Sequence, residues 1–162
     1  MTELGHAVDA AGPRGSSDAS ANTISEGSVL SFDFGRRRIG VAIGNTLVRV
    51  AHPLATIEEE GNAARLAAIA KLIDEWRPTR LVVGVPLHAD GTEHQMTREA
   101  QRFARRLRGR FALPVVEVDE RYTTQAAQSA LEAEGRGDRR HRALRDQVAA
   151  QIILQDWFDE RA

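Results

Sequence analysis

An aspartate inside an apolar strand is the feature that most limits what this chain can fold into. Residues 29–34 and 38–44 are two apolar stretches joined by a short basic turn, a pattern that predicts a β-hairpin. Asp33 lies in the first stretch. Burying an unpaired carboxylate costs roughly several kcal/mol unless a cation or several hydrogen bonds offset it. Asp33 therefore either caps the turn into Gly35 or faces a bound cation.

Acidic residues recur at two further places that can converge on Asp33. Asp119 and Glu120 follow the apolar run 115–118, and Asp146 opens a helical pattern of apolar residues. Carboxylates from two strand ends and one helix are ligands that hard divalent cations prefer. Asp119 and Glu120 point to opposite faces of a strand, so we expect only one of them to join, and we favour the longer Glu120. For Asp146, an acid placed in the first helical turn by the helix dipole is the alternative.

Length and composition point to one domain. With 162 residues the chain can bury a sizeable core. We predict a disordered N-terminal leader over residues 1–28 and a folded domain over 29–162. The chain has no cysteine, which excludes disulfides and thiolate zinc sites and fits a reducing cytoplasm. Its apolar runs are far shorter than the ~20 residues that cross a bilayer, so we expect no membrane association.

Strands and helices are predicted to alternate after the hairpin. The glycines Gly40 and Gly44 indicate a close backbone approach or a bulge in the second strand. Asn62 is expected to cap the first helix. The pattern predicts an α/β fold with a mixed five-stranded sheet flanked by helices. The remaining strands are expected within 50–57, 81–85 and 115–118. Helices are expected from 62 to 76, after Gly91, from Thr123 or Thr124 through Leu131, and from about 143 to 158.

Positive charge is concentrated although the formal net charge is only −1. The leader carries −3, so the predicted domain carries about +2. The planar guanidinium of arginine matches phosphate geometry, and such clusters can follow a phosphodiester backbone. Solvated helix faces are the alternative interpretation. The arginines form three clusters: Arg36–Arg38; Arg98, Arg102, Arg105, Arg106, Arg108 and Arg110; and Arg136, Arg139, Arg140, Arg142 and Arg145.

Several motifs, in order along the chain, resemble the YqgF/RuvX family. The resemblance implies an RNase H-like fold. It also implies a bacterial cytoplasmic nuclease that processes the 5′ end of pre-16S ribosomal RNA, or a Holliday junction resolvase that acts on branched DNA. The matching segments are Asp33–Ala42, Gly84–Leu87, Asp90–Thr92, Asp119–Thr124, and Asp146 with Ala149–Gln155.

An RNase H-like acidic cluster implies a site that uses Mg²⁺ or Mn²⁺. Two such ions can activate the attacking water and stabilise the leaving oxygen of a phosphodiester. We expect Asp33, Glu120 and Asp146 to be the catalytic residues and metal ligands, with Asp119 as the alternative to Glu120. The expected substrate-binding residues are Arg36, Arg38, Arg121 and Thr123, and the last has a helix cap as its alternative role.

One departure from the family pattern concerns Gly44-Asn45, where the family commonly has Ser-Asp. If that Asp supports metal binding, the site here loses one negative charge. Three functions therefore compete: an endonuclease, a half-sized relative of sugar kinases and actin-like ATPases, and a nucleic-acid-binding protein without turnover. The sequence leaves open whether RNA or DNA is cut and whether a homodimer forms.

Overall fold

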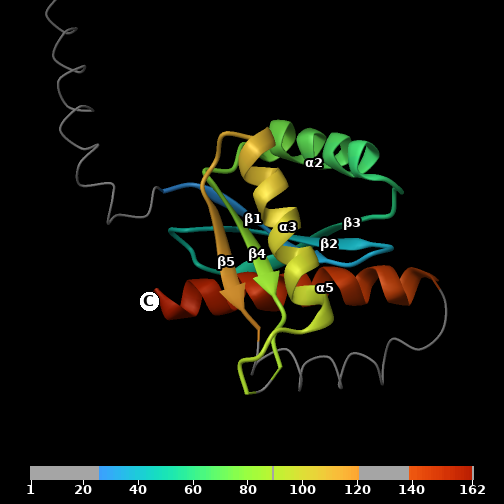
Figure 1. The fold of residues 1–162 in the computed structure, drawn as a ribbon. Helices are drawn as coiled ribbons and strands as arrows, with labels where there is room; N and C mark the ends of the chain where they lie inside the picture. The colour runs from blue at the N-terminus through green and yellow to red at the C-terminus, as the bar shows by residue number, and fades with distance from the viewer. Residues whose placement is uncertain (1–25, 89, 121–138, 162) are drawn as a thin grey trace, which may run out of the picture.

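A mixed β-sheet between helices forms the described part of the chain. The computed structural model describes residues 26–88, 90–120 and 139–161. The sheet has the order β3-β2-β1-β4-β5 (Figure 1). Its elements confirm the expected α/β architecture, a mixed five-stranded sheet flanked by helices. They are β1 (Ser28–Phe34), β2 (Ile39–Asn45), β3 (Ala51–Ile57), α2 (Asn62–Trp76), β4 (Arg80–Val85), α3 (Gln95–Arg110), β5 (Val115–Asp119) and α5 (Arg139–Glu160).

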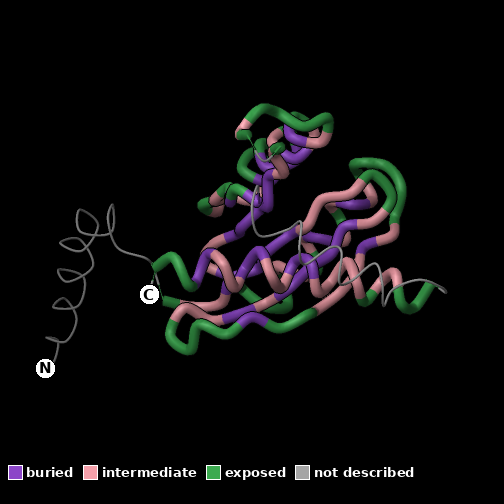
Figure 2. The backbone as a smooth tube through the Cα atoms, turned by 90° about the horizontal axis from the view of Figure 1, so that it is seen from below, coloured by how far each residue is buried: buried purple, intermediate pink, exposed green. Residues whose placement is uncertain are grey.

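The central strand β1 divides the core in two. It pairs antiparallel with β2 and parallel with β4, and β5 continues the parallel half. Because side chains alternate along a strand, Leu30 and Phe32 face the core under α2 and α3, and Val29 faces the core under α5. Asp33 shares the α5 face with Val29. Figure 2 shows that buried residues gather in the middle of the molecule, whereas exposed residues lie at its outside.

Helix α5 approaches β2 as closely as the two glycines predict. A Cβ on Gly40 would overlap the carbonyl oxygen of Asp146, and one on Gly44 would lie 2.6 Å from the Phe158 ring. On β1 the hydroxyl of Ser31 donates to the carbonyl of Ala150 at 2.7 Å. The expected close approach is therefore confirmed, and the β2–β3 register also shifts at Val41/Ala42.

A row of glutamines on α5 ties this helix to the edge strand β3. Gln147 donates to the Thr56 hydroxyl at 3.1 Å, and Gln151 donates to the Ala51 carbonyl at 2.9 Å. The Gln155 side-chain oxygen accepts from the Ala51 amide at 3.0 Å. Since an edge strand has backbone groups without a strand partner, these side chains both satisfy β3 and fix the position of α5.

Two helix starts differ from the prediction or were not predicted. Asn62 does not cap α2, because Gly61 takes the N-cap position at φ 88 without a side-chain bond. Glycine reaches this φ without steric cost. At α3 the His94 ring accepts from the Met96 amide at 3.0 Å, and the Thr97 hydroxyl accepts from the His94 amide at 2.6 Å, which makes a capping box.

Helix α5 is already helical at Arg139, the first described residue after 121–138, and so extends before the predicted start near residue 143. Residues 1–25 lie outside the described residues, so the leader stays a prediction. None of the helices in the described ranges is long and apolar enough to cross a membrane.

Candidate active site

Three carboxylates from separate elements act on one another at one end of the α5 face. Asp33 is near the end of β1, Glu120 directly follows β5, and Asp146 lies in α5. Because β1, β4 and β5 are parallel, their carboxyl ends meet at one edge of the sheet. Burial raises the pKa of Asp33 well above its ordinary value, and the negative charges of Glu120 and Asp146 raise it further.

A glycine on each side of Asp33 makes room for the other two acidic residues. Gly40 of β2 pairs with Asp33, and Gly84 of β4 follows the residue that pairs with Phe32. A Cβ on Gly84 would overlap Oε2 of Glu120, just as one on Gly40 would overlap the Asp146 backbone. Glu120 and Asp146 can therefore approach the sheet beside Asp33 only because Gly84 and Gly40 have no side chains.

Strand alternation separates Asp119 from Glu120. Glu120 is buried, with 7% exposure, and its amide donates to the Val85 carbonyl at 3.1 Å. Asp119 is exposed. Glu117, two residues earlier and on the face of Asp119, pairs with Arg108 of α3 at 3.0 Å. The structure thus brings Glu120 to Asp33 and leaves Asp119 on the α3 side of the sheet.

The two arginines of the β1–β2 turn that were expected to bind substrate are both in ion pairs. Arg38 Nε lies 2.5 Å from Oδ2 of Asp146. Arg36 binds Glu99 of α3 through both carboxylate oxygens, at 2.7 and 3.0 Å. These contacts join the turn to α5 on one side of the sheet and to α3 on the other. The other two expected substrate-binding residues, Arg121 and Thr123, lie outside the described residues.

The donor set suits a hard cation, but Asp146 is turned toward an arginine. In the described ranges no three His, Asp or Glu side chains are arranged to hold one metal ion. The Arg38 pair accounts for this arrangement, because it occupies one oxygen of Asp146. Asp33 is held by burial beside two other carboxylates. A buried carboxylate beside two others favours a divalent cation with oxygen ligands.

The departure at Gly44-Asn45 does not affect this cluster. Asn45 pairs with Ser28, at the opposite end of β1 from Asp33. Five residues of strand separate the two positions by about 17 Å. The Asn45 side chain accepts from the Leu47 amide at 2.8 Å, and so fixes the β2–β3 turn. The condition under which this position would remove a charge from the metal site is therefore not met, because Asn45 lies away from the carboxylates.

Comparison with known proteins places the same segment in a described family. The family model "RuvX: Holliday junction resolvase" matches residues 27–160. A Nitrosomonas europaea protein named "Putative pre-16S rRNA nuclease" is 56% identical over 135 residues, which cover 83% of this chain and 91% of that protein. A Nitrosomonas eutropha protein of the same name is 56% identical over 139 residues, covering 86% and 88%. T. thermophilus RuvC in complex with a Holliday junction substrate aligns with a TM-score of 0.49 and 16% identity, over 83% of this chain and 94% of that one.

Proposed function

This chain belongs to the RuvX family, and on that premise we propose that it is a divalent-metal-dependent endonuclease that hydrolyses phosphodiester bonds of structured nucleic acid. One observation carries the proposal: the partly buried carboxylate of Asp33 lies within electrostatic reach of Glu120 and Asp146, from three separate elements. The proposed substrate is the 5′ end of pre-16S ribosomal RNA, after the name of the Nitrosomonas relatives. A cytoplasmic location is part of this proposal, because precursor ribosomal RNA is made there.

In this proposal Asp33, Glu120 and Asp146 hold Mg²⁺ or Mn²⁺. Such ions activate the attacking water and stabilise the leaving oxygen. The chain itself contributes rigidity, because two of the ligands lie on or next to paired strands and the third on a helix packed against Gly40. Asp119 is the alternative to Glu120, and its exposed position on the other face disfavours it.

Arg38 has a double role in the proposal. Its guanidinium neutralises Asp146 at 2.5 Å. If Asp146 were to hold an ion, the guanidinium would be free beside the cluster, where its planar fork suits a phosphate. Arg36 holds the turn against α3 and is proposed to contact substrate at its edge, together with Arg121 and Thr123.

Resolution of a Holliday junction is the second candidate function, and the description of the matching family favours it. A four-way junction presents two symmetric strands, so this function would require a homodimer with one site for each strand. Processing of a single RNA end sets no such requirement. Sedimentation with and without a junction therefore helps to separate the two functions.

A cleavage assay tests the proposal. A 5′-extended pre-16S RNA fragment and a four-way DNA junction are each incubated with the wild type, Asp33→Asn and Asp74→Asn, in Mg²⁺ and then in Mn²⁺. Asp74 is a matched control because it undergoes the same chemical change on exposed α2, where its recorded ion pair is with Arg77. We expect metal-dependent cleavage of the RNA by the wild type and Asp74→Asn only. Cleavage that survives in Asp33→Asn contradicts the site, and failure of the wild type to cut either substrate contradicts the function.

A further inference from the structure

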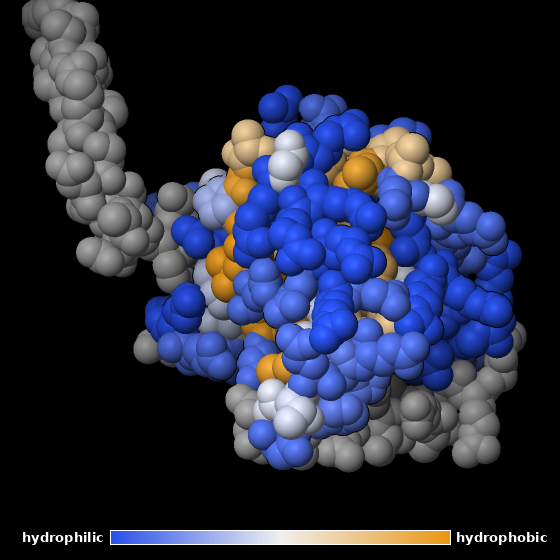
Figure 3. All heavy atoms as spheres, in the orientation of Figure 1, coloured by the Kyte–Doolittle hydropathy of each residue, from blue (hydrophilic) through white to orange (hydrophobic). Residues whose placement is uncertain are grey.

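The outward face of α3 carries positive charge that the fold does not use. The helix has six arginines and one acidic residue, Glu99, on a chain whose formal net charge is −1. Figure 3 shows strongly hydrophilic side chains over this helix, which lies in front of the sheet in the same view as Figure 1. Surfaces that only need solubility interleave both signs of charge, and this one does not.

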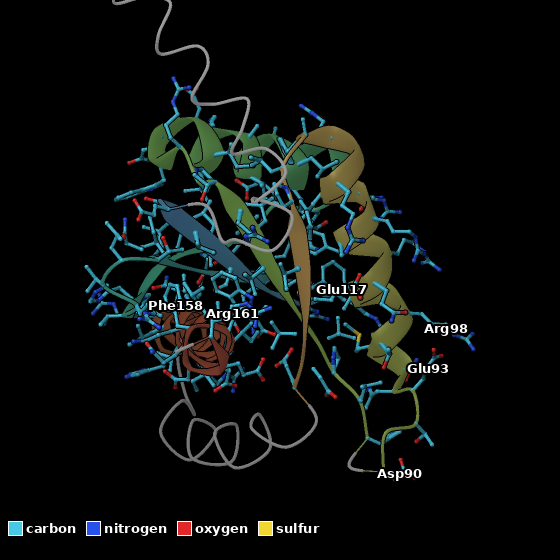
Figure 4. The ribbon with its side chains drawn as sticks, turned by 90° about the vertical axis from the view of Figure 1, so that its left-hand side faces the viewer. Asp90, Glu93, Arg98, Glu117, Phe158 and Arg161 are labelled. Carbon is cyan, nitrogen blue, oxygen red and sulfur yellow. The ribbon has the colours of Figure 1, made fainter. Side chains whose placement is uncertain are left out.

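Some of these arginines have a structural role. Arg108 pairs with Glu117 at 3.0 Å, and Arg110 lies over the Phe111 ring at 5.5 Å. Both are in the last turn of α3, where positive charge stabilises the helix dipole. Arg98 pairs with Glu93 at 3.1 Å at the other end of the helix, and its side chain points away from the sheet (Figure 4). These contacts explain three of the six.

Arg102, Arg105 and Arg106 have no such role. All three are exposed, and no side-chain hydrogen bond or ion pair in the described ranges involves them, although the charge of Arg102 helps to lower the pKa of Glu99, which already binds Arg36. Arg102 and Arg106 are four residues apart, a spacing at which like charges destabilise a helix by about 0.2–0.5 kcal/mol. The arrangement therefore lowers the stability of the free protein slightly and calls for a partner that carries negative charge.

The spacing of the outward residues forms a track. Arg98, Arg102, Arg105 and Gly109 recur at intervals of four, three and four residues, so they share one helix face, opposite the buried stripe that includes Phe103. The track is about 16 Å long, roughly half a turn of duplex. A Cβ on Gly109 would meet nothing within 4 Å, so packing does not require glycine there. Because Gly109 has no side chain, a ligand can approach the α3 backbone closely there.

The track begins beside the candidate active site. Glu99, next to Arg98, binds Arg36 in the turn that follows Asp33 on β1. From that contact α3 runs away from the carboxylates across the other face of the sheet. A substrate cut at the carboxylates reaches this track only if a second part of it extends around the sheet edge.

We infer that α3 binds the phosphate backbone of a double-helical arm that adjoins the cleavage site. The inference rests on the proposed function and adds to it a feature of the substrate, namely a duplex flanking the cut. The shared chemistry is a phosphodiester backbone, and RNA and DNA duplexes are its two sources. Arg102 and Arg105 are its central contacts.

Binding of short RNA and DNA duplexes, measured in EDTA between about 50 and 200 mM KCl, tests this inference without any need for cleavage. Each phosphate contact contributes about 0.9 to the slope of log Kd against log salt. Arg102→Gln/Arg105→Gln should therefore lower the slope by about 1.8. If the wild-type and variant plots meet at about 1 M salt, the variant binds about 60-fold more weakly at about 0.1 M salt. Arg105→Gln alone should lower it by about 0.9, which keeps the test valid if the double variant folds poorly.

The matched control is Lys71→Gln/Arg77→Gln, which removes one exposed charge within α2 and one at its C-cap. An unchanged slope in this control, with a reduced slope in the α3 variants, supports the track, and an effect in only one duplex identifies that duplex as the source of the backbone. An equal reduction in both double variants, an unchanged slope in the α3 variants, or no duplex binding by the wild type overturns the inference. If the wild type cuts RNA and the α3 variants keep the wild-type salt slope, the proposed nuclease activity is retained and only the α3 binding track is rejected.

Discussion

Substitution of Gly84 by alanine should disturb Glu120 while leaving the fold intact. The new Cβ would overlap Oε2 of Glu120 and lie 2.6 Å from its Cδ and 2.5 Å from Cδ1 of Ile153. Ordinary contact begins near 3.4 Å, so the Glu120 Cδ has to retreat by at least about 0.8 Å. A long side chain moves more easily than the β4 backbone, and the strain is therefore relieved mainly by the carboxylate.

The expected magnitudes differ for stability and activity. Overpacking costs about 1–3 kcal/mol, and replacing glycine in a strand returns about 0.5–1 kcal/mol. The net loss of at most about 2.5 kcal/mol should lower Tm by at most about 10 °C. A catalytic group displaced by about 1 Å can lose about 100-fold in rate, equivalent to about 2.7 kcal/mol of transition-state stabilisation. The activity of Gly84→Ala should thus fall much further than its stability.

Thermal melts and metal-dependent cleavage rates measure the two effects on the same preparations. Val82→Ala is the control, because Val82 is buried on the same face of β4 and its truncation costs similar stability without reaching Glu120. If Gly84 acts through Glu120, Gly84→Ala should cost no further activity in a Glu120→Gln background. Near-normal cleavage by Gly84→Ala, or fully additive losses in the double variant, would refute this reasoning.

Three further outcomes follow from the same contacts. The pKa of Asp33 is raised above its unfolded value of ~3.9, so its ionised form destabilises the folded chain. Asp33→Asn should therefore raise the free energy of unfolding at pH 7 in EDTA. This gain should disappear as the pH falls toward ~3.9. Chemical denaturation across pH checks this, and an equal or lower stability of the variant at pH 7 contradicts it. Arg38→Gln removes the partner of Asp146 and the proposed phosphate contact. It should reduce kcat/KM by about 10–100-fold and tighten Mn²⁺ binding in calorimetry. Unchanged Mn²⁺ affinity would argue against competition between Arg38 and the ion for Asp146. Ser31→Ala removes a side-chain bond to the Ala150 carbonyl, which keeps its backbone partner within α5, and should lower stability by about 0.5–1.5 kcal/mol; urea denaturation with no measurable loss would show that this bond does not anchor α5.

The sequence predicted the elements because their signals are local. The apolar runs around Asp33 and before Asp119 are strands, and the periodic pattern after Asp146 is a helix. Gly40 and Gly44 were correctly interpreted as points of close approach, since a glycine in a strand has few other reasons to be there. Alternation along a strand was also sufficient to separate Asp119 from Glu120.

The parts that the sequence did not predict depend on contacts between distant segments. Gly84 was assigned to an apolar strand, and its role is visible only once Glu120 is placed over it. His94 caps α3 with a ring nitrogen, which is outside the usual set of capping residues. The concern over Asn45 came from its position in the family pattern, and the antiparallel register of β1 and β2 places it at the far end of the sheet from Asp33.

The central claim is that Asp33, Glu120 and Asp146 form one cation site. Anomalous diffraction from crystals grown with Mn²⁺ tests it most directly. The account predicts a manganese peak among these three carboxylates, with Arg38 moved away from Asp146, and no peak in crystals of Asp33→Asn. Manganese bound elsewhere, or an Arg38–Asp146 pair that persists at saturating Mn²⁺, would contradict it.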